Sequence, residues 1–170
     1  MMCGRRGYRL DILTNDADRE LRNSLGRFAT GVTVVTCAGE AGLCGITVNS
    51  FSSVSLDPPR ILWNVAKVSR SVDAFLAADF FAVNVLAADQ EALSTHFAQS
   101  DRPRFNKVDF RLSARGVPLL AATLACFECR TYQVHECGDH HIIVGEIEDF
   151  RYVDGDPLLF YAGQYARLAR

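Results

Sequence analysis

The sequence lacks a surplus of basic residues. Its 18 lysine and arginine residues are balanced by 20 aspartate and glutamate residues, which gives a formal net charge of −2 at pH 7. Proteins that bind nucleic acids or anionic membrane surfaces usually carry a basic stripe or cluster. We therefore expect neither a nucleic-acid partner nor a membrane partner.

Long hydrophobic runs are also missing. The longest apolar stretches, among them Phe80–Val83 and Ile142–Val144, are far shorter than the roughly 20 residues that cross a bilayer. The opening residues Met1–Gly7 carry charge with no apolar run behind them, unlike a signal peptide. The six cysteines are scattered through a chain long enough to bury a core without disulfides. These features predict reduced thiols and a cytoplasmic location.

Glycine-rich nucleotide motifs do not occur either. The absence of GxGxxG and GxxxxGK(S/T) leaves a Rossmann fingerprint and a P-loop unsupported, so any nucleotide must be held in another way.

Cys126, Cys129 and the histidines downstream suggest zinc. On strands, however, residues three apart, like these cysteines, point to opposite faces, as do the adjacent His140 and His141. We expect no metal site.

The patterns that are present predict a mainly β chain with short helices. Helical spacing predicts a helix over 16–30, and two more are expected at 69–77 and 89–99. Runs rich in β-branched and aromatic residues predict strands over 32–37, 43–50, 61–65, 80–86, 123–136, 140–152 and 158–161. The polar segment 100–117 is long enough to be a functional loop.

This order of elements favours a barrel. The strands are not regularly separated by helices, which argues against a doubly wound parallel sheet. Six or seven strands with three short helices indicate a closed or split barrel, because closure removes exposed strand edges. We expect one domain over residues 16–170 after a tail over 1–15, which we expect to be partly disordered.

Three polar segments are candidates for a binding site, each with a plain alternative. Thr47–Ser55 gathers hydroxyls, an amide and backbone N–H groups in a bend, which suits a polar heterocycle or a phosphate. It could equally be a serine-rich turn that satisfies its own backbone. Lys67–Ser71 opens a predicted helix and suits a phosphate, or is an ordinary N-cap with solvated charges. His140 begins a strand, where it could meet a ligand or lie on the surface.

Taken in order along the chain, seven segments carry a resemblance to a known family. They are Gly31–Thr36, Gly45–Pro59, Lys67–Ser71, Phe80–Leu86, Phe97–Ala98, Gly138–His140 and Leu159–Gly163. Together they resemble the short-chain flavin reductase family, whose members serve as reductase components of two-component flavin monooxygenases. The likeness covers about Leu21 to Tyr165. It implies an FMN-binding split β-barrel, a Greek-key-like closed barrel with short flanking helices, assembled as a homodimer.

The resemblance also implies roles for particular residues. FMN or FAD would bind as cofactor, with NADH or NADPH as the hydride donor. The isoalloxazine and ribityl chain would lie against a cluster opened by Thr47: Asn49, Ser50, Phe51, Ser52, Ser53 and Ser55. The flavin phosphate would be held by Ser69, Arg70 and Ser71, beside Lys67. The loop at Arg104 and Phe105 would close over the outer part of the cofactor, and the nicotinamide would contact His140, Phe160, Tyr161 and Gly163.

The expected activity is hydride transfer from a reduced nicotinamide to flavin, which would supply a partner monooxygenase. His140, the one catalytic-site candidate, would orient the nicotinamide, since the hydride needs no protein base. The alternatives are a protein with bound flavin that reduces another small-molecule acceptor, such as a corrinoid, and a non-catalytic flavin- or haem-binding protein. The chain departs from the family pattern at Arg60 and at Trp63–Asn64, where smaller apolar residues are usual.

Overall fold

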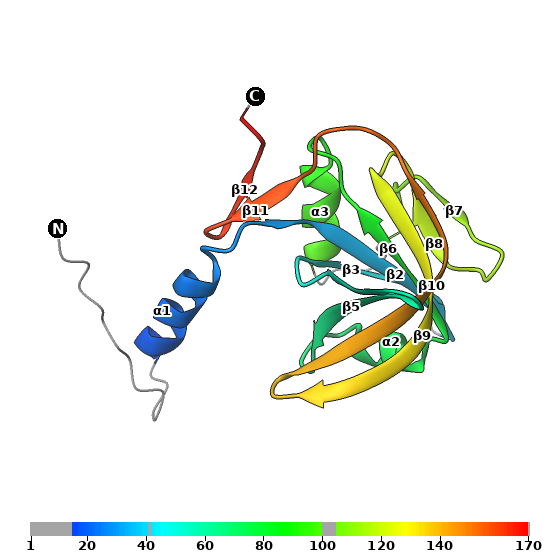
Figure 1. The fold of residues 1–170 in the computed structure, drawn as a ribbon, viewed down its shortest axis with the longest axis horizontal. Coiled ribbons are helices and arrows are strands. Elements are labelled where there is room, and N and C mark those ends of the chain that lie inside the picture. Colours follow the sequence, from blue (N-terminus) through cyan, green and yellow to red (C-terminus); the bar gives the residue numbers. More distant parts are fainter. Residues whose placement is uncertain (1–14, 41, 100–104, 170) are drawn as a thin grey trace.

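The computed structural model describes residues 15–40, 42–99 and 105–169 (Figure 1). Its main element is a seven-stranded antiparallel sheet in the order β3-β2-β6-β9-β10-β5-β4. The strands are β2 (Thr33–Gly39), β3 (Gly42–Val48), β4 (Ser52–Leu56), β5 (Pro59–Ala66), β6 (Phe80–Val85), β9 (Ala125–Cys137) and β10 (His140–Tyr152). The predicted mainly β class is therefore confirmed.

Smaller elements surround this sheet. A three-stranded sheet joins β1 (Thr30–Gly31), β11 (Leu159–Tyr161) and β12 (Gln164–Ala166), and a hairpin pairs β7 (Phe110–Leu112) with β8 (Pro118–Leu120). The helices are α1 (Asn15–Leu25), α2 (Val72–Ala77) and α3 (Glu91–Ala98). Figure 1 shows α1 standing apart from the seven-stranded sheet, on the side of β11 and β12. Within the described residues, no helix has the length and apolar character needed to cross a bilayer.

Closure of the seven-stranded sheet is only partial. Its two edge strands are β3 and β4, and no hydrogen-bonded ladder joins them in the described part of the chain. β3 does approach β5, and Ile46, Val48 and Phe51 pack against the same core cluster as Trp63 and Val65. Side-chain packing, rather than backbone pairing, therefore brings the two ends of the sheet together. The described residues contain no continuous closed barrel.

Two hydrophobic clusters form most of the core. In the first, Trp63 is fully buried, with its ring centroid 4.9 Å from that of Phe75 on α2 and 5.9 Å from that of Phe81 on β6. The second lies under α3, around Phe97 and Leu158. Because β5 alternates between buried and partly exposed side chains, Trp63 and Val65 face inward, while Asn64 and Ala66 face outward.

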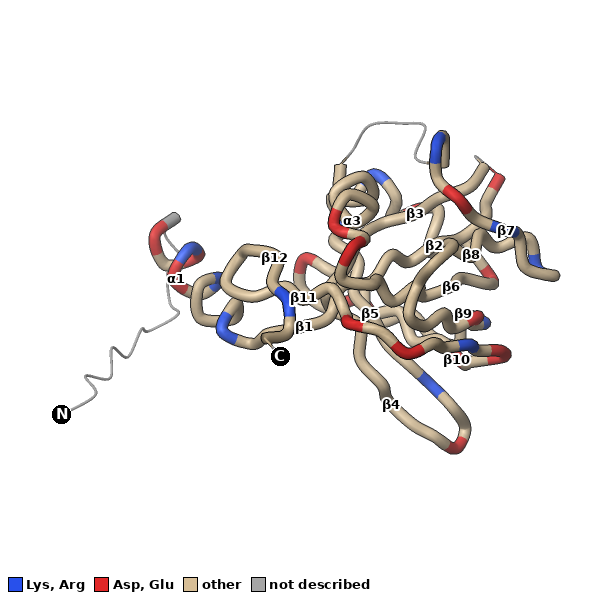
Figure 2. Tube along the Cα trace, turned by 90° about the horizontal axis from the view of Figure 1, so that it is seen from above, with Lys and Arg blue, Asp and Glu red and all other residues tan. Residues whose placement is uncertain are grey.

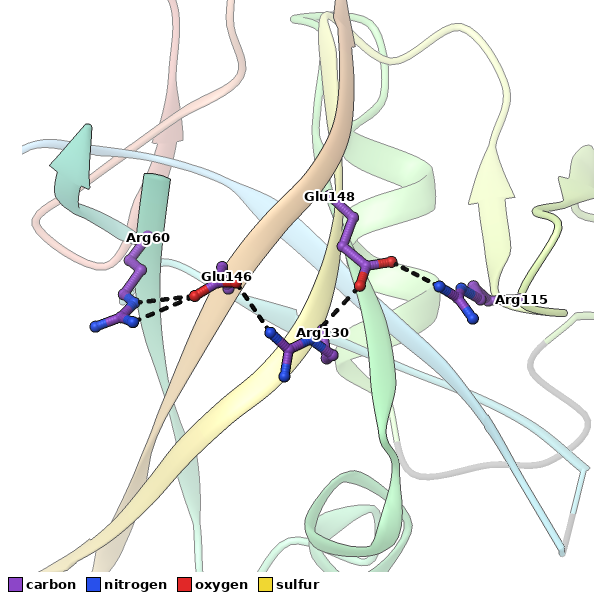
Figure 3. Close-up of polar contacts among 5 residues, drawn as sticks. All are labelled: Arg60, Arg115, Arg130, Glu146 and Glu148. Atoms are coloured by element: carbon purple, nitrogen blue, oxygen red, sulfur yellow. Dashed lines mark hydrogen bonds and ion pairs between the residues drawn. The ribbon is translucent and has the colours of Figure 1, made fainter. Parts of the chain in front are cut away.

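The outer face of the sheet carries a row of alternating charges (Figure 3). Glu146 pairs with Arg60 at 3.2 Å and with Arg130 at 2.9 Å, and Glu148 pairs with Arg130 at 3.5 Å and with Arg115 at 3.3 Å. Partly exposed pairs of this kind add little stability singly. In Figure 2, basic and acidic residues are interspersed along the trace, in keeping with the balanced composition.

Several predicted elements differ from those observed. The expected bend through Ser55 was wrong in part, because Ser52–Leu56 is the edge strand β4, where only one side of the backbone needs a partner. The predicted loop over 100–117 contains β7 and the segment before β8. The first helix ends at Leu25 rather than near residue 30. Most of the predicted tail, residues 1–14, lies outside the described residues.

Candidate functional site

Ser50 fastens the loop between β3 and β4 to β5, the strand next to the edge strand β4. Its hydroxyl accepts a hydrogen bond from the Asn64 backbone N–H at 2.9 Å, and lies 3.4 Å from the Asn64 carbonyl oxygen, to which it can donate. These bonds continue the β4–β5 contact beyond the end of their ladder, which begins at the Ser52–Leu62 pair. The loop is held against β5, and Asn49 at its start is exposed.

The segment after β5 is joined to the β9–β10 turn. The Lys67 backbone N–H donates to the Asp139 carbonyl oxygen at 2.9 Å, and the Lys67 ammonium forms an ion pair with Glu136. The hydrogen bond from Lys67 lowers the pKa of the Glu136 carboxyl. Lys67 is therefore already matched by an acidic side chain, which weakens the case for it as a phosphate ligand.

The start of α2 is built from the residues predicted to hold a phosphate. The Ser71 N–H lies 3.3 Å from the Ser69 hydroxyl oxygen, which accepts from it, and Ser71 is the buried N-cap of this six-residue helix. Arg70 is exposed. A serine hydroxyl that accepts from the backbone N–H two residues on forms a local turn. Ser71 at the N-cap matches the ordinary N-cap considered as the plain alternative for this segment.

His140 opens β10 beside the same strand, β5. Its backbone is paired with Ala66, and its Nδ1 lies 2.8 Å from the Asp139 carboxylate. This hydrogen bond lowers the pKa of the Asp139 carboxyl. A histidine that donates through Nδ1 to a carboxylate has its ring orientation fixed, with Nε2 left to face a ligand. Its side chain is 44% exposed, so a ligand can reach it.

A second group of predicted residues gathers around α3. The Thr47 hydroxyl donates to the Ser94 carbonyl oxygen at 2.6 Å, and the Ser94 hydroxyl lies 2.8 Å from the Tyr165 hydroxyl. This chain of hydrogen bonds joins β3 to α3 and α3 to β12. Phe105 and Phe160 pack into the cluster under α3, where Phe105 meets Phe97 at 5.3 Å between ring centroids.

The predicted site residues thus fall into two groups, one tied to β5 and the other to α3 and the C-terminal hairpin. The group on β5 and its neighbours comprises Ser50, Lys67, Ser69, Arg70, Ser71 and His140. The group around α3 and the C-terminal hairpin comprises Thr47, Phe105, Phe160, Tyr161 and Gly163. Ser52, Ser53 and Ser55 run along β4 toward the far end of β5. Arg104 lies outside the described residues.

Sequence reasoning missed two features of this region. Ser94 and Tyr165 join β3, α3 and β12 within the second group, and no sequence signal marks them. Asn64 has a buried Oδ1 with no hydrogen-bond partner, although it lies next to Ser50. The sequence marked Asn64 only as a departure from the family pattern at Trp63–Asn64, which did not predict an unpaired side-chain oxygen.

The chain also has a surface hollow of about 220 Å³ elsewhere. It is lined by Phe80, Arg115, Cys129, Glu148 and neighbouring side chains, and none of the predicted site residues lines it. The described residues hold no group of three or more histidine, cysteine or acidic side chains placed to bind a metal ion. Burial raises the pKa of the Cys126 thiol to about 11, so the thiol is protonated at neutral pH.

Comparison with known proteins places these observations in context. The family described as "Flavin reductase like domain" matches residues 25–169. The chain is 50% identical over 152 residues to "FMN reductase (NADH) SmoA" of Agrobacterium fabrum (strain C58), covering 89% of this chain and 87% of that protein. It is 43% identical to the reductase component of the flavin-dependent trigonelline monooxygenase of Acinetobacter baylyi, covering 86% of this chain but only 48% of that protein.

A solved structure gives the same picture of the fold. The NADH:FAD oxidoreductase SgcE6 of Streptomyces globisporus, in complex with NAD and FAD fragments, superposes with a TM-score of 0.87 at 38% identity. The match covers 94% of this chain and 97% of that one.

Proposed function

The chain belongs to the flavin reductase like domain family, and on that premise we propose that it is an NAD(P)H-dependent flavin reductase. It transfers a hydride from a reduced nicotinamide to FMN or FAD and supplies the reduced flavin to a partner monooxygenase. The relation to SmoA, named an FMN reductase (NADH), spans nearly the whole of both chains. The observation that carries the proposal is the meeting of the Ser50 loop, the Lys67–Ser71 segment and His140 at one end of β5.

The residues at this end of β5 fit a flavin. An isoalloxazine ring presents N–H and C=O groups along one edge, and needs hydrogen-bond partners of both kinds. The buried Asn64 Oδ1 lacks a donor, and the Asn49–Phe51 loop offers backbone groups beside it. When bound, the flavin supplies the ring that accepts the hydride. Asn49, Ser50, Phe51, Ser52, Ser53 and Ser55 hold the ring and ribityl chain, and Ser69, Arg70 and Ser71 hold the phosphate.

His140 positions the nicotinamide in this proposal. The Asp139 carboxylate holds the proton on Nδ1 and fixes the imidazole, which then orients the donor ring against the flavin. Holding two rings in register is the main contribution that the protein can make, because hydride transfer between them needs no protein base. Phe160, Tyr161 and Gly163, which belong to the group around α3 and not to the group of His140, complete the nicotinamide site in this proposal.

In this proposal the protein is a cytoplasmic homodimer. Each subunit is a split barrel, open between β3 and the β4–β5 hairpin. Four large side chains near one end of the sheet support a partner copy: Val54 and Leu56 on edge strand β4, and Phe150 and Tyr152 at the end of β10, are each more than half exposed. An edge strand with exposed apolar side chains is a template for pairing unless something covers it. A second copy of the chain covers this surface.

The proposed activity is tested by following NADH and NADPH oxidation at 340 nm, with and without added FMN or FAD, after recording the spectrum of the isolated protein. Turnover that requires added flavin is the expected result, and it makes flavin a substrate. A yellow protein that NADH reduces but that turns over free flavin slowly would replace this proposal with a bound-flavin electron donor, with corrinoids as acceptors to test. Folded protein without oxidation under either condition would indicate a binding protein.

A further inference from the structure

Asn64 combines a buried polar atom with a precise position on the sheet. Its Oδ1 is buried and has no hydrogen-bond partner. Buried acceptors in folded proteins are almost always paired, because leaving one unpaired costs the full free energy of removing it from water. An unpaired acceptor at a predicted site therefore calls for a donor that the chain itself does not supply.

The position of Asn64 is fixed from three sides. Its backbone bonds to the Ser50 hydroxyl, and across the sheet it is paired with Ile142 on β10. Its neighbour Trp63 is fully buried against Phe75, so β5 cannot rotate without opening the core. Asn64 must therefore keep its side chain on the outer face of the sheet.

His140 lies on the same face of the sheet as Asn64. Ala66, two residues beyond Asn64 on the same face, is the backbone partner of His140. Residues two apart on a strand are separated by about 6.6 Å. The Asn64 amide thus lies between Ser50, on the predicted flavin side, and His140, on the predicted nicotinamide side.

We propose that Asn64 is a positioning residue of the reductase site, whose Oδ1 accepts a hydrogen bond from an amide-type N–H of a bound ring. Two donors share this chemistry: the ring N–H of the isoalloxazine and the carboxamide of the nicotinamide. The inference rests on the proposed function, since it needs a ligand at this end of β5. The competing explanation is a buried water that pairs with Oδ1 and has no part in binding.

The test compares Asn64→Leu, which removes the acceptor at similar size, with the wild type and with Gln133→Leu. Gln133 is an exposed residue of the same outer face, where it is paired with Val144 across the β9–β10 ladder. Three quantities are measured: the thermal midpoint without ligand, the Kd for FMN and FAD without nicotinamide, and the KM for NADH at saturating flavin. The emission of Trp63, the one tryptophan of the chain, reports flavin binding.

The expected result is a split between stability and binding. Asn64→Leu leaves the unliganded thermal midpoint unchanged or raises it, because an unpaired polar group is removed. The same variant weakens binding about tenfold: in the flavin Kd if the isoalloxazine is the donor, or in the KM for NADH if the carboxamide is. Gln133→Leu changes none of the three quantities. If Asn64→Leu does not fold, Asn64→Ala takes its place.

Two outcomes overturn the inference and are distinguishable. An unchanged flavin Kd and an unchanged KM for NADH in Asn64→Leu would overturn the inference, whatever the thermal midpoint does. A lower midpoint in the same variant would then mean that Asn64 pairs with a structural water. Wild-type protein that binds no flavin and oxidises no NADH would overturn the proposed function itself, and the inference with it.

Discussion

His140 is partly exposed, so its replacement should change the proposed activity without disturbing the fold. It is exposed enough for a ligand to reach it, and its ring is held by Asp139. We expect His140→Ala to raise the KM for NADH about 3- to 10-fold, the range given by one lost positioning hydrogen bond. Flavin affinity should stay within about twofold of wild type, because the proposed function assigns His140 to the nicotinamide and not to the flavin. Steady-state kinetics and flavin titration measure the two effects.

His135 provides a matched control for this substitution. It lies on the adjacent strand, where its backbone is paired with Ile142, and its side chain is exposed. His135→Ala should leave both constants unchanged. Equal KM values for NADH in wild type and His140→Ala would remove His140 from the site.

Gly45 is a position where the missing side chain matters for packing. A Cβ atom there would lie 2.6 Å from Cε1 of Phe97, a fully buried ring of α3, and 3.5 Å from Phe105. We expect Gly45→Ala to destabilise the protein by about 1–3 kcal/mol, the usual cost of overpacking a core. Chemical denaturation of wild type and Gly45→Ala measures this difference in the free energy of unfolding.

Gly31 is the control for Gly45, because a Cβ atom there would meet nothing within 4 Å. Gly31→Ala should cost less than about 0.5 kcal/mol, as surface substitutions usually do. Equal losses in the two variants would show that packing against Phe97 is not the cause.

At the scale of elements, the β11–β12 hairpin carries local backbone strain. Ala162 and Gly163 form its two-residue turn, with φ angles of 49° and 81°. Asparagine adopts positive φ more readily than alanine does, and Asn-Gly is the favoured pair in such turns. We expect Ala162→Asn to stabilise the protein by about 0.5–1 kcal/mol, and Gly163→Ala to destabilise it by about 1 kcal/mol. Thermal midpoints that moved in the same direction in both variants would contradict this account.

The link between the segment after β5 and the β9–β10 hairpin should depend on pH. The Lys67 ammonium lowers the folded-state pKa of the Glu136 carboxyl below its ordinary value of 4.5. A lowered carboxyl pKa stabilises the folded state above the unfolded value, and this stabilisation is lost as the pH falls through the folded value. Glu136→Gln should therefore lower the thermal midpoint slightly at pH 7, and the difference from wild type should vanish in acid below the folded pKa.

The effect at Glu136 should be small, because the Lys67 and Glu136 side chains are 33% and 72% exposed. Lys67→Met provides the reference background. In it, Glu136→Gln should no longer change the midpoint with pH, and a persisting effect would assign the pKa shift to another group.

Sequence reasoning located the strands whose own residues have a high strand propensity. β2, β6 and β10 are rich in β-branched or aromatic residues, and each was expected close to its observed position. β4 was missed because three of its five residues are serine, and its pairing with β5 is what makes it a strand. The two-residue strand β1 exists through its pairing with β11, a partner far along the chain.

The candidate site shows the same division between local and long-range information. Ser50, His140 and the Lys67–Ser71 segment were named from local sequence and resemblance, and the register of β5 brings them to one end of the sheet. Asn64 could not be recognised in this way, because its unpaired Oδ1 depends on how β5 lies against the Ser50 loop and β10. The Ser94–Tyr165 contact spans 71 residues and likewise has no local signature.

On the scale of the whole molecule, the predicted residues form two groups, and the Asn49–Phe51 loop belongs to the first of them. One group is tied to β5 and the other to α3 and the C-terminal hairpin. The central claim is that flavin and nicotinamide meet at this loop, rather than in the hollow near Phe80 and Arg115.

The most direct measurement is a crystal structure of the protein with FMN and NAD⁺ bound. We predict the isoalloxazine against the Asn49–Phe51 loop, with the nicotinamide between it and His140. Rings bound in the hollow beside Arg115 and Glu148, or away from both β5 and α3, would contradict the account.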